Sequence, residues 1–173
     1  WKSKDEARII SMTLFGSKSS YLDGLLDFLA SFEKIKKINK ISRWIFDTFT
    51  FRVYIPMSQN PNIDIENAVP EDYVDRLINK NVKIVYVDNK MKKAGLDATF
   101  WRFLVMSESL GEGSRIRYLL RDVDWKMTIL EAKSIGKWIS SKRRFLRFNL
   151  FPVCAGPLLS GLVGGVHTAK SKL

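Results

Sequence analysis

The chain has 173 residues and a formal net charge of +11, and its 46% hydrophobic and 27% charged residues are those of an ordinary globular protein. Its single cysteine, Cys154, excludes an internal disulfide framework and a cysteine-based zinc site. The excess of Lys and Arg suits a nucleic acid, an anionic membrane surface or a phosphate-bearing substrate. Because the chain begins with Trp1 and not Met, we expect residues 1–173 to be one domain taken from a longer protein.

Segments rich in β-branched and aromatic residues alternate along the chain with segments of helical periodicity. The predicted strands cover residues 8–15, 51–55, 82–87, 116–120 and 144–148. The predicted helices cover residues 22–40, 70–78, 96–106 and 128–139. Thr128 and Glu131 form a capping-box pattern at the start of the last helix. This alternation predicts an α/β fold, with a Rossmann-like, mainly parallel sheet and helices on both faces.

The stretch from residue 148 to 166 contains no charged residue, so its length raises the question of a membrane span. Pro152 and Pro157 interrupt the stretch, and four glycines, including Gly164 and Gly165, dilute it. A continuous lipid-exposed helix is therefore unfavourable. We expect a buried, glycine-rich loop that lines a site.

Two carboxylates, Asp122 and Asp124, directly follow the predicted strand at 116–120. At the carboxyl end of a strand, both can turn toward the crevice in which open α/β sheets bind ligands. Their oxygens suit Mg²⁺ or Mn²⁺, which often share such ligands with phosphates. The Asp-X-Asp pattern alone is also typical of a solvated turn, and only its context favours a metal site.

An ordered set of segments supplies that context. The set comprises Leu14-Phe15-Gly16 with Tyr21-Leu22-Asp23-Gly24-Leu25-Leu26, Phe51-Arg52-Val53-Tyr54-Ile55, Phe100-Trp101-Arg102-Phe103-Leu104, Tyr118-Leu119-Leu120-Arg121-Asp122-Val123-Asp124, and residues 158–165. With this set the chain resembles the GT-A-type glycosyltransferases with a DXD motif, and within them the capsular-polysaccharide-type group. That group has histidines and an acid where this chain has residues 146–149, so the resemblance identifies no catalytic base.

The resemblance implies a GT-A fold and a metal-dependent enzyme that moves a sugar from a nucleotide sugar, UDP-linked, to a glycan or glycoprotein acceptor. The implied cofactor is Mn²⁺ or Mg²⁺, held by Asp122, Asp124 and, as a third ligand, His167. The implied nucleotide-sugar contacts are Thr13, Leu14, Phe15, Gly16, Asp88, Arg102 and Asp122. Gly164 and Gly165 would border the donor sugar. Structural alternatives stay open: a salt bridge for Arg102, an ordinary turn for residues 13–16, and a chain-end position for His167.

Two other functions are compatible with the residues. A metal-dependent phosphotransferase or nuclease would use the same two acids, but it needs further acids at neighbouring strand ends for two-metal chemistry. A basic nucleic-acid-binding module would interleave aromatic side chains with a basic stripe, whereas the aromatics here follow core periodicity. We therefore expect no nucleic-acid partner and no membrane span in this fragment. The expected location is cytoplasmic, in the host cytoplasm if the protein is viral.

Overall fold

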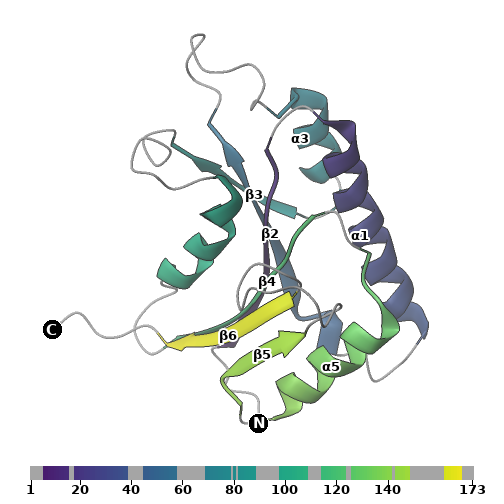
Figure 1. Ribbon diagram of the computed structural model, residues 1–173, viewed down its shortest axis with the longest axis vertical. Helices are drawn as coiled ribbons and strands as arrows, with labels where there is room; N and C mark the ends of the chain where they lie inside the picture. Colours follow the sequence, from purple (N-terminus) through teal and green to yellow (C-terminus); the bar gives the residue numbers. More distant parts are fainter. Residues whose placement is uncertain are drawn as a thin grey trace, which may run out of the picture.

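A six-stranded mixed sheet, in the order β3-β2-β1-β4-β6-β5, forms the centre of the structure (Figure 1). The structure is a computed structural model that describes residues 6–15, 18–38, 45–57, 69–78, 80, 82–88, 98–108, 114–123, 126–141, 143–148 and 162–168. The strands are β1 (Glu6–Thr13), β2 (Phe49–Pro56), β3 (Val82–Val87), β4 (Arg115–Leu120), β5 (Phe145–Phe148) and β6 (Leu162–Thr168).

The strand directions divide the sheet into two parts. Strands β1, β2, β3 and β4 are parallel, whereas β6 runs antiparallel to both β4 and β5. From β1 the chain proceeds outward to β2 and β3, and it then returns to place β4 on the other side of β1. The order therefore reverses between β1 and β4, which makes this the topological switch point of the sheet.

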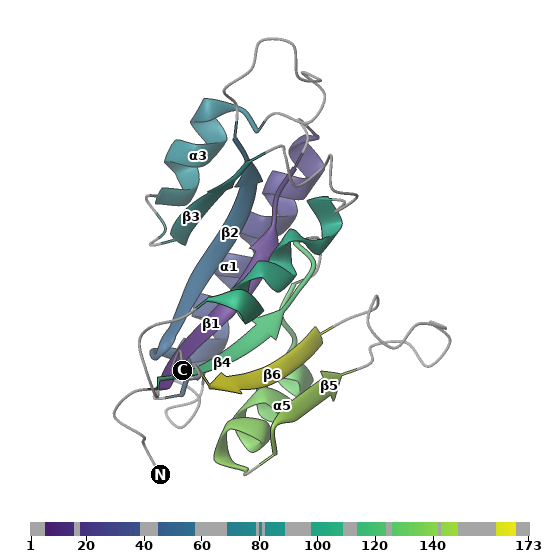
Figure 2. The same cartoon turned by 90° about the vertical axis from the view of Figure 1, so that its left-hand side faces the viewer.

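Helices cover both faces of the sheet, as the sequence predicts. Helices α1 (Ser19–Ile38), α3 (Glu71–Ile78) and α5 (Ile129–Ser140) pack on one face, and the 3₁₀ helix η2 (Ala98–Ser107) packs on the other (Figures 1 and 2). In Figure 1, η2 is the teal-green helix to the left of the sheet, opposite α1 and α3. Within the described residues, no helix is long and apolar enough to cross a membrane.

The alternation of side chains along β2 shows how the two layers form. Phe51, Val53 and Ile55 join the large core beneath α1, because every second residue of a strand points to the same face. Arg52 and Tyr54 point to the opposite face, where Tyr54 packs in the core that includes Trp101 of η2. Burying each large apolar side chain stabilises the fold by about 1.5–3 kcal/mol.

Helix η2 forms where a helix is predicted at 96–106 and leaves one large aromatic side chain at the surface. The Phe100 side chain is 42% exposed. Met106 is likewise 43% exposed, whereas Phe103 is partly buried against the core beneath η2. The neighbouring positions Trp101 and Val105 are buried instead.

The predicted glycine-rich loop is wrong for its last residues, which form the strand β6. Gly164 lies opposite Leu119 and Gly165 opposite Tyr118. A Cβ at Gly165 would collide with the hydroxyl and ring of Tyr118, and a Cβ at Gly164 would lie 2.8 Å from Cδ2 of Leu119. The glycines thus allow neighbouring side chains to lie over a strand. Residues 149–161 of the uncharged stretch fall outside the described residues.

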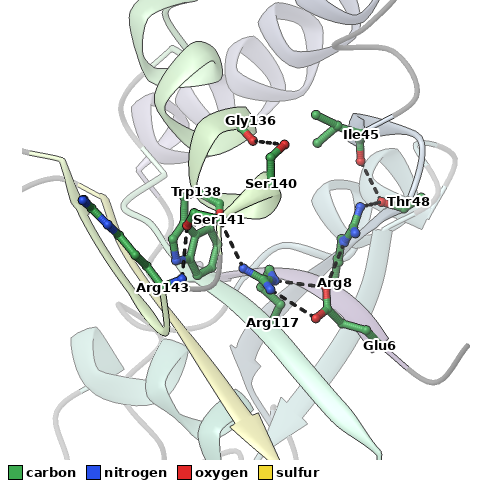
Figure 3. A network of polar contacts seen from close by, with 10 residues as sticks. All are labelled: Glu6, Arg8, Ile45, Thr48, Arg117, Gly136, Trp138, Ser140, Ser141 and Arg143. Carbon is green, nitrogen blue, oxygen red and sulfur yellow. Dashed lines mark hydrogen bonds and ion pairs between the residues drawn. The ribbon is translucent and has the colours of Figure 1, made fainter. Parts of the chain in front are cut away.

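A charged network ties the amino end of β1 to β4 (Figure 3). Nε and Nη2 of Arg117 donate to the two carboxylate oxygens of Glu6 at 3.0 and 3.3 Å, and Nε of Arg8 donates to Glu6 Oε1 at 3.2 Å. The Arg117 guanidinium also lies over the ring of Trp138 in α5, 4.8 Å from its centroid. Burial would raise the pKa of Glu6, but the two arginines outweigh it and hold that pKa below its ordinary value.

Candidate functional site

The candidate site lies at the carboxyl ends of β1 and β4, on the two sides of the switch point. The register pairs Ser11 with Leu120, and the N–H of Arg121 donates to the carbonyl of Ser11 at 3.0 Å. The two strands therefore stay side by side up to the predicted acidic motif. In open α/β sheets, ligands bind in the crevice outside the carboxyl ends of strands at such a point.

Consecutive residues of the motif diverge to opposite faces of the sheet. Arg121 turns toward α1 and α5, where it forms an ion pair with Glu131 and lies 4.5 Å from the ring centroid of Phe28. Asp122 turns toward η2 and forms an ion pair with Arg102. Arg121 is thus an internal anchor for the end of β4, and Asp122 is the residue presented to the crevice.

Glu131 has two roles at the start of α5, and neither involves a ligand. Its backbone N–H donates to Thr128 Oγ1 at 3.1 Å, and its Oε2 accepts from the Thr128 N–H at 3.2 Å, which completes the predicted capping box. The same carboxylate pairs with Arg121. The position of α5 is therefore coupled directly to the residue that precedes Asp122.

Two predicted nucleotide-sugar contacts, Arg102 and Asp122, are brought together by this geometry. The Arg102 side chain is only 7% exposed, whereas that of Asp122 is 34% exposed. The backbone carbonyl of Arg102 accepts a hydrogen bond of 2.6 Å from Ser11 Oγ, which fixes η2 against β1. A buried, anchored guanidinium therefore orients a carboxylate that reaches the surface.

Thr13, at the end of β1, contributes a buried hydroxyl to the same crevice. The residue is 7% exposed, and its Oγ1 has no hydrogen-bond partner in the described part of the chain. Its side chain shares a face with Ser11, so it points to the η2 side of the sheet, as Asp122 does. Leaving a buried hydroxyl unpaired costs about 1–3 kcal/mol, and a ligand that hydrogen-bonds to it would remove that cost.

A second polar network on the same face was not predicted from the sequence. Arg52 forms an ion pair with Glu108, which follows η2, and the Tyr54 hydroxyl donates to Glu108 Oε1 at 2.7 Å. Burial raises the pKa of Tyr54 above its ordinary value, despite the nearby charge of Arg52. The sequence did carry a signal for this network, because Arg52 and Tyr54 alternate with three apolar residues in β2. These contacts hold the end of η2, and with it Arg102.

Other predicted contacts are placed less favourably. The Leu14 side chain is buried in the main core, and its N–H donates to the Tyr54 carbonyl at 3.0 Å, so neither is open to a ligand. The half-buried Phe15 ring lies 6.0 Å from that of Tyr21. Asp88 follows β3, three strands from β4, which at about 4.8 Å per strand separates it from Asp122 by roughly 14 Å. Gly16 and Asp124 lie outside the described residues.

The strand register separates His167 from the acidic motif. His167 lies opposite Ile116, six residues before Asp122, because β6 runs antiparallel to β4. At about 3.3 Å per residue the two backbone positions are roughly 20 Å apart along the strand direction. The backbone register thus places His167 beside the amino end of β4, and its role as a third metal ligand stays a prediction. Gly164, paired with Leu119, lies closer to the crevice but within the sheet.

The side chains that remain as candidate metal ligands suit a hard cation only in part. Over the described ranges, no three His, Cys, Asp or Glu side chains are grouped so that they could hold a metal ion. Asp122 is partly open to solvent at the switch point and supplies carboxylate oxygens of the kind that Mg²⁺ and Mn²⁺ prefer. A cation there would need Asp124, water or phosphate oxygens to complete its coordination.

Comparisons with known proteins found no match for this chain. No protein-family model matches the chain, and no curated protein or solved structure matches it.

Proposed function

We propose that this chain is a metal-dependent glycosyltransferase with a GT-A fold, which moves a sugar from a UDP-linked donor to a glycan or glycoprotein acceptor. The observation that carries the proposal is the pairing of Asp122 with the buried Arg102 at the switch point between β1 and β4. A mainly parallel, mixed sheet with helices on both faces is compatible with the nucleotide-binding architecture that the resemblance implies.

The two acidic residues would hold the cation, and the cation would offset the charge of the diphosphate. Asp122 and Asp124 would bind Mn²⁺ or Mg²⁺ through carboxylate oxygens. The bound cation would supply Lewis-acid stabilisation of the charge on the departing nucleoside diphosphate. Arg102 would keep the Asp122 carboxylate in one orientation, because its own backbone is fixed by Ser11.

The end of β1 would receive the nucleoside. The unpaired hydroxyl of Thr13 can donate to or accept from a ribose or base, and it lies on the same face as Asp122. The Arg52–Glu108 pair would act indirectly, by keeping η2 and Arg102 in place. These roles require no change in the sheet, so the site would be largely formed before the donor binds.

Calorimetry with UDP and UMP, each with Mn²⁺ and after chelation, tests the proposal. We expect UDP to bind more tightly than UMP only when the divalent ion is present, since UMP lacks the diphosphate whose oxygens would add ligands to the ion. Asp122→Asn should remove this difference. Asp75→Asn, which changes an exposed carboxylate of α3, is the matched control and should retain it.

The outcomes separate the competing functions. Equal affinities with and without chelator would contradict the metal-dependent site and favour a binding module. Cleavage of nucleic acid or transfer of phosphate under the same conditions would favour the phosphotransferase or nuclease. A screen of nucleotide sugars for hydrolysis, with and without Mn²⁺, would then identify the donor.

A further inference from the structure

The positive charge of the chain is concentrated in α5 and the turn that leads into β5. Residues 126–148 contain seven Lys or Arg and one acid, which gives this segment a net +6 of the chain's +11. Strand β5 is an edge of the sheet, and α5 packs beside it (Figure 2). More than half of the net charge therefore lies in 23 residues at one side of the molecule.

The single acid of this segment does not offset the exposed cations. Glu131 is fully buried, with 0% exposure, and it is paired internally with Arg121. At the amino end of the segment, Lys126 is neutralised by Asp27 of α1 at 3.0 Å. The uncompensated charge thus lies farther along α5 and in the turn after it.

One side of α5 and the turn after it carry a basic face. Ala132, Ile135 and Trp138 are buried toward the sheet. The outer side carries Leu130, Lys133 and Lys137, which are spaced i, i+3 and i+7 and therefore share one stripe of the helix. Exposed Arg143 and Arg144 follow in the turn. The basic face comprises Leu130, Lys133, Lys137, Arg143 and Arg144.

The cations of the basic face are open to an external partner. In the described part of the structure, none of the four Lys and Arg side chains takes part in an ion pair. Figure 3 shows the Arg143 side chain extending away from Trp138 and Ser141. Repulsion among four unpaired cations destabilises the fold, and an anionic surface would relieve it.

We propose that the basic face docks on an anionic membrane surface. Beside the cations, the aliphatic side chains of Leu130 and Ile129 are 69% and 54% exposed at the start of α5. A lipid interface accommodates both groups, because cations bind the headgroup phosphates while aliphatic side chains enter the acyl boundary. Nothing in this docking depends on the proposed glycosyltransferase activity.

A nucleic acid fits the same surface less well. Residues 126–148 contain no Asn or Gln, the side chains that read adenine, and an exposed Leu130 gains nothing against a phosphate backbone. The membrane is therefore the partner whose chemistry uses the aliphatic and the cationic groups together.

Vesicle co-sedimentation of the full chain tests the proposal. We expect binding to mixed phosphatidylcholine and phosphatidylserine vesicles, and little binding to phosphatidylcholine alone. Each Lys near an anionic surface increases binding about fivefold, so Lys133→Glu with Lys137→Glu should weaken it by about 25-fold or more. The control is Lys34→Glu with Lys37→Glu, which makes the same charge change on exposed positions of α1 and should have a much smaller effect.

Three results would overturn the proposal. These are equal losses in the two charge-reversed variants, equal binding to neutral and anionic vesicles, and tighter binding to duplex DNA than to anionic vesicles. Leu130→Gln separates lipid from other polyanions, since it should weaken vesicle binding without changing binding to heparin. Lys133→Gln with Lys137→Gln repeats the test with neutral side chains if charge reversal disturbs folding, as circular dichroism would reveal.

Discussion

Arg121 and Glu131 form an ion pair in which the two side chains are 4% and 0% exposed. The pair joins the end of β4 to the first turn of α5, and Asp122 directly follows Arg121 in the chain. Taking two charges out of water is costly, and their attraction repays this cost only while both partners are present. The geometry of the candidate site thus depends on a contact that lies on the opposite face of the sheet from the Arg102–Asp122 pair.

Removing the charge of Glu131 should destabilise the fold strongly. Glu131→Gln keeps a residue that can complete the capping box, but it removes the carboxylate that pairs with the buried guanidinium of Arg121. We expect the free energy of unfolding, measured in urea, to fall by about 3–5 kcal/mol. Adding Arg121→Met should recover most of the loss, because an apolar side chain needs no partner. Equal stability of the single and double variants would contradict this account.

Asp124 is predicted to be essential for metal-dependent donor binding. Asp124→Ala should abolish the Mn²⁺-dependent part of UDP affinity and leave the unfolding midpoint nearly unchanged. Calorimetry and thermal unfolding of the same preparation measure the two effects. An unchanged UDP affinity in the presence of Mn²⁺ would exclude Asp124 as a metal ligand, whatever the role of Asp122.

Gly165 should not tolerate a side chain. Gly165→Ala would place a Cβ against the hydroxyl and ring of Tyr118, and overpacking of this kind typically costs about 1–3 kcal/mol. Tyr118→Leu in the same chain should restore part of the loss, because it removes the ring. Chemical denaturation measures both changes.

Gly136 provides the matched control for this substitution. Among the described residues, a Cβ there would meet only Ile45 Cδ1, at an ordinary 3.6 Å, and Gly136 lies inside α5. Gly136→Ala should therefore stabilise the chain by about 0.5–1 kcal/mol through helix propensity. If both alanines had the same effect, the collision with Tyr118 would not be the cause of the loss at Gly165.

The Glu6 network predicts a specific loss of stability in acid. Because Arg117 and Arg8 lower the pKa of Glu6 below its reference value of 4.5, the folded state binds this proton less readily than the unfolded state. The contribution of Glu6 is therefore complete above pH 4.5 and is lost as the pH falls through the lower, folded pKa. Unfolding of Glu6→Gln should show a smaller decrease over that range than the unmodified chain.

Glu71→Gln controls for the general effect of removing a carboxylate. Glu71 is exposed in the first turn of α3 and takes part in no ion pair within the described part of the chain. We expect its acid transition to follow that of the unmodified chain. An acid limb unchanged by Glu6→Gln would show that the pairing with Arg117 does not stabilise the folded state.

Local pattern was enough to predict much of the fold. The apolar run at 82–87 coincides with β3, and the capping box of Thr128 and Glu131 begins α5. Hydrophobic periodicity and capping chemistry act within a few residues, so they can be read without the tertiary structure. For the same reason Asp122 could be placed at the carboxyl end of a strand before its neighbours were known.

Only the tertiary structure decided which residues meet. Arg102 and Asp122 are twenty positions apart, and their pairing depends on η2 crossing the face of β1. The glycines of β6 resembled a loop because glycine is unfavourable in strands, but the side chains of Tyr118 and Leu119 in β4 leave no room for a Cβ at Gly165 and Gly164. The antiparallel direction of β6 likewise carries His167 toward the beginning of β4. Strand direction and long-range packing are properties of the whole sheet, so local sequence could not determine them.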